Sequence, residues 1–331
     1  MIQSLRTTLH PAWYQGHRRK PPYFEGWYYK LVDESEQHRY AIIPGVFRGA
    51  DSEASHAFVQ VLDGMTGQTI YQRYPVSEFW AADGSLDLRV GPSRFTETAI
   101  NLSIDSPELN LAGELRFEGS IPWPVSLASP GIMGWYAWVP LMECYHGVVS
   151  LDHAIRGVLR VAGRDIDFGG GRGYIEKDWG RSFPSAWVWT QSNHFQEEGT
   201  SLTASVAIIP WLRSSFRGFI IGLWHADALY RFATYTGARI EELELTDDHV
   251  HWIVSNSRHR LEIHTSRGAA GLLRGPSGMD MGIRVPETLD ADVSLRLWDL
   301  ESGSTRPLFE GTGLNGGLEV AGDLQRLLAA L

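Results

Sequence analysis

Hydrophobic and polar residues alternate in short runs along most of the chain, and turn-forming residues separate these runs. Because successive side chains of a strand point to opposite faces, each run is typical of a β-strand. Asp63-Gly64 and Asp83-Gly84 have the composition of hairpin turns. The predicted strands are Tyr23–Val32, Ala41–Val46, Ala57–Leu62, Thr69–Pro75, Ser85–Val90, Ala99–Ser103, Leu115–Phe117, Tyr145–Leu151, Ala154–Val161, Ile166–Phe168, Trp187–Phe195, Ser201–Ile209, Phe219–His225, Leu229–Thr236, Val250–Val254, Arg260–His264, Val293–Leu300 and Leu314–Val320.

Two segments depart from this pattern. Asp323–Leu331 has leucines at helical spacing and predicts a short C-terminal helix. Ile121–Pro140 holds four prolines and three tryptophans, too many prolines for a central strand and too much apolar surface for a solvated linker. We expect it to be an ordered, packed loop. The whole pattern predicts an all-β chain, and its 331 residues favour two domains, 1–165 and 166–331.

The composition narrows the functional classes. A net charge of −10, with no basic cluster larger than Arg18-Arg19-Lys20, argues against nucleic acid as a partner. Cys144 is the only cysteine, so no intrachain disulfide can form and a cytoplasmic location is expected. Neither a signal peptide nor a membrane span is predicted. The 13 tryptophans and 35 glycines favour many short strands around an interior lined by aromatic rings.

The segment from residue 187 to residue 195 indicates a binding site. In an extended strand, one face would carry Trp187, Trp189, Gln191, Asn193 and Phe195. Two indoles and two carboxamides on one face are typical of a pocket with an apolar floor and hydrogen-bonding groups. The alternative is a barrel interior filled by its own side chains.

Glu25, Trp27 and Tyr29 form a similar stripe near the N-terminus. A buried carboxyl group beside an indole can act as a proton donor near neutral pH, because desolvation disfavours its charged form. The alternative for Glu25 is an ion pair with Arg or Lys that holds two strands together.

The run Glu176-Lys177-Asp178 adds two acids next to Trp179. If the run is extended, its two acids face one side, and Lys177 and Trp179 face the other. Two acids on one side can divide the roles of proton donor and charge stabiliser. The alternative is an ion-pair network with Arg172 and Arg181.

Motifs for several common chemistries are missing. The glycines at 169–173 lack the Gly-Lys-Ser/Thr ending of a phosphate loop, and there is no Gly-x-Ser-x-Gly or Asp-Asp-x-x-Asp motif. His249 and His251 share one strand face, but no third ligand clusters with them in the sequence, so no metal site is predicted. His146 and His194 are better placed for function, although a lone histidine is more often structural.

Several motifs together resemble the tocopherol cyclase family. They are Tyr23–Lys30, Glu143–Gly147, Glu176–Gly180, Phe183-Pro184 and Trp187–Asn193. Their order and spacing agree with the family from about Pro11 to Gly322. Two positions depart from the plant pattern, which has Asn where this chain has Asp178 and a residue other than His at the position of His194.

The resemblance implies two consecutive lipocalin-like β-barrel or β-sandwich domains, similar to those of carotenoid hydratases and some fungal Diels–Alderases. It also implies a hydrophobic substrate, such as a prenyl quinol or another terpenoid, and a ring closure that uses no cofactor. Such a ring closure needs a proton for an alkene and aromatic walls that tolerate the resulting carbocation.

For this chemistry we expect one of Asp178, Glu176 and Glu25 to donate the proton. We expect the substrate to be bound in one dry chamber by Trp27, Tyr29, His146, Trp179, Trp187, Trp189, Gln191, Asn193 and His194. Two alternatives stay open: a carrier that only holds an apolar ligand, and a terpenoid hydratase or isomerase. Peripheral contact with a membrane through Ile121–Pro140 is a further expectation, and the oligomeric state is left open.

Overall fold

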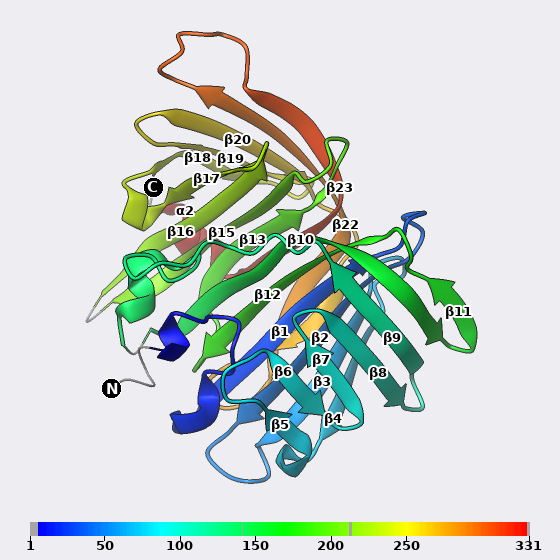
Figure 1. Ribbon diagram of the computed structural model, residues 1–331. Coiled ribbons are helices and arrows are strands. Elements are labelled where there is room, and N and C mark those ends of the chain that lie inside the picture. Colours follow the sequence, from blue (N-terminus) through cyan, green and yellow to red (C-terminus); the bar gives the residue numbers. More distant parts are fainter. Residues whose placement is uncertain (1–5, 141, 212–213, 330–331) are drawn as a thin grey trace. The chain divides into compact units, whose positions relative to one another are not determined.

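Antiparallel β-sheet makes up most of the chain, as the alternating pattern predicts (Figure 1). The computed structural model describes residues 6–140, 142–211 and 214–329. The chain divides into two compact units, one formed by Met1–Phe183 with Gly271–Val285 and the other by Pro184–Ala270 with Pro286–Leu331. The predicted all-β fold with a short C-terminal helix is confirmed.

The first sheet has 12 strands, in the order β4-β3-β2-β1-β12-β10-β9-β8-β7-β6-β5, and β11 pairs with β10. Short 3₁₀-helices precede β1 and β5, and a third lies between β9 and β10. The bounds are η1 Gly16–Arg18, β1 Tyr23–Val32, β2 Arg39–Arg48, β3 His56–Asp63, β4 Thr69–Tyr74, η2 Val76–Glu78, β5 Phe79–Ala81, β6 Asp87–Val90, β7 Ser93–Thr96, β8 Ala99–Asp105, β9 Asn110–Glu118, η3 Gly134–Trp138, β10 Cys144–Val161, β11 Arg164–Asp167 and β12 Arg172–Gly180.

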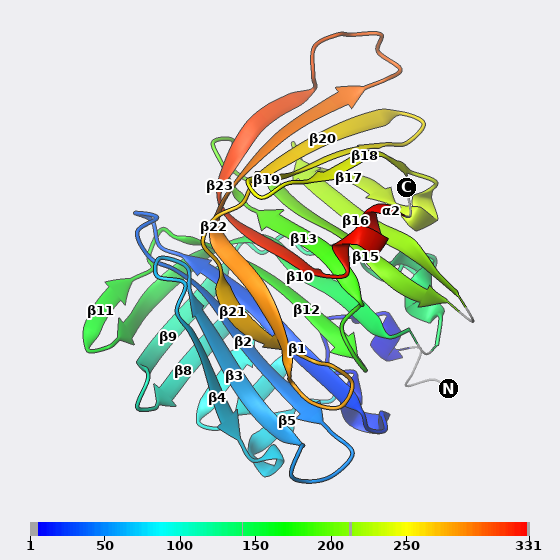
Figure 2. The same cartoon turned by 180° about the vertical axis from the view of Figure 1, so that it is seen from behind.

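The second sheet has 11 strands, in the order β17-β16-β15-β13-β23-β22-β20-β19-β18, with β14 paired to β23 and β21 to β22 (Figure 2). The bounds are β13 Ala186–Ser192, β14 His194–Phe195, β15 Ser201–Trp211, β16 Ser214–His225, β17 Ala228–Ala233, η4 Thr234–Thr236, β18 Arg239–Leu245, β19 His249–Ser255, β20 His259–Ser266, β21 Gly271–Gly275, β22 Ile283–Asp299, β23 Phe309–Gly322 and α2 Leu324–Ala329.

Each predicted strand overlaps an observed one, and the differences have local causes. The predicted strands Tyr145–Leu151 and Ala154–Val161 form the single strand β10, because two register shifts against β12 let the backbone continue. Strand β18 was not predicted, since its sequence is rich in charge. It lies at the edge of the second sheet, where one side of the strand has no partner to exclude charged residues.

The two units divide at a different place from the predicted boundary after residue 165. Strand β12 follows that boundary, but its backbone pairs with β1 on one side and β10 on the other. These ladders hold β12 in the first unit, which continues to Phe183. The strand β21 also belongs to the first unit, although it comes from the second half of the sequence.

The C-terminal helix and the proline-rich loop are both packed. Leu327 of α2 is fully buried in the core of the second unit, whereas Leu331, predicted to continue the helix, lies outside the described residues. In the loop Ile121–Pro140, Trp123 is 3% exposed, and the backbone of Ile121 is hydrogen-bonded to β10. Within the described parts of the chain, no helix is both long and apolar enough to cross a bilayer.

The imidazole of His153 is buried inside the first unit, with 1% of its surface exposed. Its Nδ1 lies 3.0 Å from Ser150 Oγ, and its ring packs on Phe117 with the ring centres 4.4 Å apart. A Cβ atom at Gly173 would lie 2.3 Å from His153 Nε2, so this site requires glycine. Burial, with a further contribution from the charge of Arg172, lowers the pKa of His153 to about 3.

We expect His153 to make the protein less stable in acid. In the unfolded chain this imidazole takes up a proton near pH 6.5, whereas the native state keeps it neutral down to about pH 3. Between pH 7 and pH 5 the difference should lower the free energy of unfolding by about 2 kcal/mol, and the loss should continue to about pH 3. Urea denaturation of the wild type and of His153→Gln at both pH values measures this effect. Equal losses in the two proteins would contradict it.

Candidate functional site

Strands β1, β12 and β10 are neighbours in the first sheet and carry the candidate residues of the first unit. Trp27 is opposite Lys177 in the register, and Asp178 is opposite His146. Because directly opposite side chains share a face, the two faces of the sheet can be assigned. One face carries Glu25, Trp27, Tyr29, Lys177 and Trp179, and the other carries His146, Glu176 and Asp178. Trp27 and Asp178 therefore lie on opposite faces.

A fully buried ion pair between Glu25 and Lys177 joins β1 to β12. The Glu25 carboxylate also accepts hydrogen bonds from the hydroxyl of Tyr23 and from the backbone N–H of Gln15, which lies 3.0 Å from both carboxylate oxygens. Donors on both oxygens suit an ionised carboxylate. This geometry supports the ion-pair interpretation of Glu25 over proton donation.

Lys177 connects this network to the surrounding indoles. Its Nζ donates a hydrogen bond to the backbone carbonyl of Trp13 at 2.7 Å and lies 4.6 Å from the ring centres of both Trp27 and Trp179. Burial lowers the pKa of Lys177, and the Glu25 carboxylate opposes that shift by stabilising the ammonium group. The ring faces of Trp27 and Trp179 thus already contact a cation that belongs to the protein.

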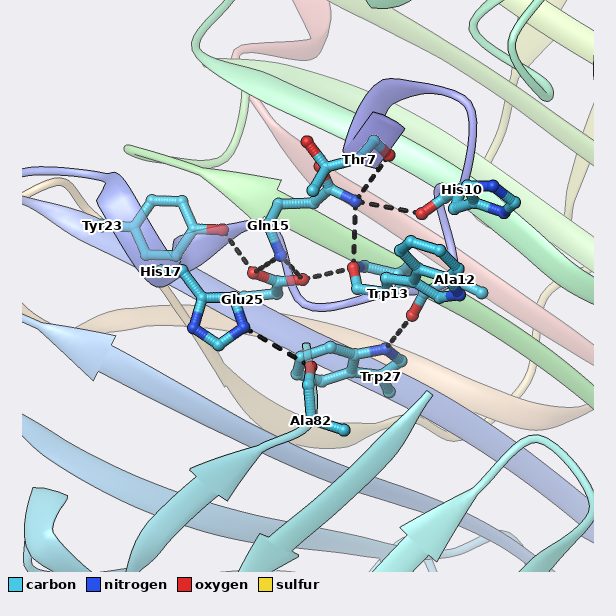
Figure 3. Close-up of polar contacts among 11 residues, drawn as sticks. Thr7, His10, Ala12, Trp13, Gln15, His17, Tyr23, Glu25, Trp27 and Ala82 are labelled. Carbon is cyan, nitrogen blue, oxygen red and sulfur yellow. Dashed lines mark hydrogen bonds and ion pairs between the residues drawn. The ribbon is translucent and has the colours of Figure 1, made fainter. Parts of the chain in front are cut away.

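An N-terminal segment, residues 10–15, is fastened to this face of the sheet (Figure 3). Trp27 Nε1 donates to the carbonyl of Ala12 at 3.1 Å, and the backbone N–H of Gln15 donates to Glu25. The side-chain amide of Gln15 donates to the backbone carbonyls of Thr7, His10 and Trp13. The segment therefore covers the ion pair and separates it from solvent.

Tyr29 and Trp179 pack as core residues on the same face. The Tyr29 hydroxyl donates to the carbonyl of Thr96 at 3.0 Å, and its ring centre lies 5.8 Å from that of Phe95. The Trp179 indole stacks on Tyr145 with ring centres 5.5 Å apart. These contacts show that aromatic side chains of the protein itself pack around Tyr29 and Trp179 on this face of the first sheet.

A second polar cluster lies on the opposite face of β12 and joins His146, Glu176 and Asp178. His146 Nδ1 lies 2.9 Å from Asp178 Oδ1, and His146 Nε2 lies 3.5 Å from Glu176 Oε2. The side chains are 13%, 6% and 31% exposed for His146, Glu176 and Asp178. Tyr174 donates its hydroxyl hydrogen to Glu176, and Arg172 pairs with Asp152 instead of joining the cluster. One imidazole thus connects the two acids.

This arrangement can move a proton between two carboxyl groups. In the tautomer that donates Nδ1–H to Asp178, the Nε2 of His146 can take a proton from Glu176 or return it. The nearby Cys144 does not compete, because burial and the charges of Asp178 and Glu143 raise the pKa of its thiol well above the usual value. The ligand atoms of the three clustered side chains lie within 4.8 Å of one another, so they could also hold a divalent cation.

A pocket of about 520 Å³ in the first unit is lined mainly by residues 9–13 and by the loop Ile121–Pro140, together with Val148 and Val149 of β10. His146, Glu176 and Asp178 are not among its lining residues. Val148, which lines the pocket, is directly opposite Glu176 in the pairing of β10 with β12. The lining is largely apolar, and its residues Val125 and Leu127 are 42% and 73% exposed. A pocket of this size and lining suits an apolar ligand.

In the second unit, β13 carries the predicted row of aromatic and amide side chains. Trp187, Trp189 and Gln191 alternate with residues such as Val188, which packs into the hydrophobic core. Trp187 and Trp189 are 6% and 5% exposed, and Gln191 is fully buried. Trp187 Nε1 donates to Glu319 Oε2 at 2.7 Å. The row therefore exists, on the face of β13 away from that core.

The predicted row ends at Asn193. This residue lies between β13 and β14, where the regular alternation stops, and Phe195 packs with Val188 in the hydrophobic core instead of joining the tryptophans. Asn193 is buried, and its Oδ1 lies 3.4 Å from Gln191 Nε2 and 3.1 Å from His194 Nδ1. The substrate-binding roles of these residues stay a prediction.

The tocopherol cyclase-like family model matches residues 115–322. The chain belongs to the tocopherol cyclase-like family. It is similar to the rice (Oryza sativa subsp. japonica) protein named probable tocopherol cyclase, chloroplastic, with 28% identity over 203 residues, and to the maize (Zea mays) tocopherol cyclase, chloroplastic, with 27% identity over 203 residues. Each match covers 57% of this chain but only 42% and 41% of the two relatives. The family match includes the His146 cluster and excludes β1 with Glu25.

Solved structures share the fold of this tocopherol cyclase-like chain. CghA with Sch210972 is similar with a TM-score of 0.56 and 12% identity, over 92% of this chain and 89% of CghA. Kievitone hydratase from Nectria haematococca has a TM-score of 0.52 and 11% identity, over 90% of this chain and 89% of the hydratase. At these identities the likeness shows the fold alone, and it confirms the expected lipocalin-like architecture.

Two acids of this family member, the buried Glu287 and the half-buried Glu319, were not among the candidates from the sequence. Glu287 on β22 is directly opposite Glu319 on β23, which is in turn opposite Trp189. Glu287 is fully buried, and Glu319 accepts the hydrogen bond from Trp187. The sequence signal that could have identified Glu287 is its place as an acid in a run whose other alternate residues are apolar. It lies in the part of β22 before Val293, where the sequence predicts no strand.

Proposed function

We propose that this chain is an enzyme that protonates a double bond of a prenylated quinol, or of a similar terpenoid, and thereby starts a ring closure. The observation that carries the proposal is the imidazole of His146 held between Asp178 and Glu176. A largely apolar pocket of about 520 Å³ in the same unit supports it. Membership of the tocopherol cyclase-like family supports the reaction class, and the names of the curated relatives supply the substrate class.

Glu176 is the acid in the proposed reaction. Its protonated carboxyl group transfers the proton to the less substituted carbon of the alkene, and the other carbon becomes a tertiary carbocation. The quinol oxygen captures this cation by forming a carbon–oxygen bond, and the hydroxyl proton returns to the Glu176 carboxylate. The product is an isomer of the substrate, and the enzyme ends in its starting protonation state.

His146 and Asp178 act through Glu176. Asp178 accepts the Nδ1–H of His146 at 2.9 Å and so fixes the ring orientation, which leaves Nε2 to exchange a proton with Glu176. Asp178 only has to accept a hydrogen bond, so the Asn of the plant pattern can serve in the same way. Glu25 has no part in the proposal, because Lys177 already engages its carboxylate.

The pocket is the proposed binding site for the apolar chain of the substrate. One lining residue, Val148, is opposite Glu176 in the pairing of β10 with β12. Each buried methylene of a prenyl chain would contribute ~0.8 kcal/mol. The exposed Val125 and Leu127 give an apolar approach to the pocket. Their position within Ile121–Pro140 supports the peripheral membrane contact predicted for that loop.

The test is incubation of the purified chain with a hydroquinone that bears a prenyl chain, in H₂O and in D₂O, followed by mass spectrometry. In H₂O we expect a product with the mass of the substrate. In D₂O, after exchangeable positions are returned to hydrogen, the product should retain one carbon-bound deuterium, because the acid delivers a solvent-derived deuteron to carbon. A product heavier by one water would indicate a hydratase, and bound but unchanged substrate would indicate a carrier. Either result overturns the cyclisation.

A further inference from the structure

Six histidine and glutamate side chains gather on one face of β18, β19 and β20, opposite the hydrophobic core of the second unit. Glu244 of β18 is opposite His251 of β19, which is in turn opposite His264 of β20. Strand pairing therefore supplies the additional ligands that His249 and His251 lack along the sequence. The cluster consists of Glu242, Glu244, His249, His251, Glu262 and His264.

The imidazole of His251 is held between two carboxylates. Its Nε2 lies 3.1 Å from Glu262 Oε1, and its Nδ1 lies 3.4 Å from Glu242 Oε1. When Nε2–H is donated to Glu262, the lone pair of Nδ1 is directed to the Glu242 side. A histidine that ligates a metal through one nitrogen usually donates the other N–H to a carboxylate in this way. Arg296 lies 3.8 Å from Glu262 and offsets its charge, so Glu262 supports the site rather than binding the ion.

The spacing of the remaining groups fits a small cation. The ligand atoms of Glu242, Glu244 and His251 lie within 4.8 Å of one another. In a tetrahedral zinc site, bonds of about 2.0–2.2 Å place two ligand atoms roughly 3.3–3.6 Å apart, a range that includes the 3.4 Å between His251 Nδ1 and Glu242 Oε1. Only small movements of the exposed Glu244 side chain would complete the set, since this side chain is 55% exposed.

The charges of the cluster also favour a cation. Within the described part of the chain, Glu242 and Glu244 have histidines but no Lys or Arg as ion-pair partners. They stand on the same face of an edge strand, where two like charges repel each other.

We propose that Glu242, Glu244 and His251 bind one divalent transition-metal cation of the zinc type. The mixed donor set of imidazole and carboxylate selects such an ion over Ca²⁺ or Mg²⁺, which prefer oxygen ligands alone. The ion joins the edge strand β18 to β19, on a face of the second unit that has no part in the proposed reaction. His249, whose Nε2 lies 3.8 Å from Glu244 Oε2, is a further donor beside the site.

The test is titration of the EDTA-treated full chain with ZnCl₂ by isothermal calorimetry, combined with thermal denaturation. We expect the chain to bind one equivalent of Zn²⁺ at the cluster, and we expect this binding to raise the melting temperature. Glu244→Gln and His251→Ala should weaken this binding at least tenfold and abolish the thermal shift. Glu262→Gln should weaken it about 10–100-fold, because this carboxylate orients the imidazole.

Two control variants make the result specific. His259→Gln changes a histidine on β20 that packs on Tyr230 outside the cluster, and it should bind zinc as the wild type does. Glu176→Gln removes an acid from the other possible ligand set, which consists of His146, Glu176 and Asp178. This variant should still bind one equivalent of Zn²⁺ at the histidine and glutamate cluster. The proposal is overturned if millimolar ZnCl₂ gives no binding, if His251→Ala binds as well as the wild type, or if Glu176→Gln alone abolishes binding.

Discussion

Replacing Lys177 by methionine is expected to lower the free energy of unfolding by about 3–5 kcal/mol, because it leaves the carboxylate of Glu25 buried without its ammonium partner. Methionine retains an unbranched apolar side chain between Trp27 and Trp179, so most of the packing survives and the change isolates the charge. The N-terminal segment should loosen as well, since the carbonyl of Trp13 loses its donor. Urea denaturation followed by tryptophan fluorescence measures the loss.

The double variant Glu25→Gln/Lys177→Met separates lost charge pairing from lost packing. With both charges removed, we expect the stability to recover by at least about 2 kcal/mol over the single variant, because no isolated charge remains in the interior. Lys20→Met is the matched control, since Lys20 is exposed, and it should leave the unfolding curve unchanged. Equal losses in the single and double variants would show that the ion pair is not the cause.

Replacing Glu176 by glutamine is expected to lower the turnover of a prenyl quinol by about 10²–10⁴-fold, the usual contribution of a general acid. The amide has nearly the shape of the carboxyl group and can still accept the hydrogen bond from Tyr174, but it has no acidic proton to transfer. Ligand binding, measured by quenching of tryptophan fluorescence, should be preserved. The effect should therefore appear in kcat and leave the dissociation constant nearly unchanged.

Two further variants locate the acid. Asp178→Asn should keep most of the turnover, because its amide oxygen still accepts the Nδ1–H of His146. Asp165→Asn changes an exposed acid of the first unit that pairs with Arg160, and it should have no effect on the rate. Full activity in Glu176→Gln, or a larger loss in Asp178→Asn than in Glu176→Gln, would assign proton donation to another group.

The strands were predictable because their pattern is local. Hydrophobic alternation in Ala99–Ser103 and in Val293–Leu300 reports burial of alternate side chains, which a strand with one face in a core requires, and both segments overlap strands. Prediction failed where the buried positions of a strand do not coincide with an alternation of apolar and polar residues. The charged edge strand β18 has little apolar alternation, and the first part of β22 holds the buried Glu287.

The candidate site was predictable only in part. The sequence correctly put Glu176 and Asp178 on one side of a strand and Lys177 and Trp179 on the other, because alternation follows from backbone geometry alone. It offered ion pairing and proton donation as alternatives for Glu25 without a way to choose. Choosing between these two roles required the position of Lys177, which lies 152 residues from Glu25 along the chain.

The sequence by itself determined the all-β class, the position of most strands and, through motifs such as Glu176–Gly180, the family of this protein. Only the tertiary structure decided which side chains meet. The pairing of β1 and β10 with β12 buries one acid against a lysine and holds another beside His146, and the pairing of β18 to β20 gathers the histidine and glutamate cluster. The physical reason is that alternation depends on neighbours in the chain, whereas register and strand order depend on the closure of long loops and on the burial of the whole sheet.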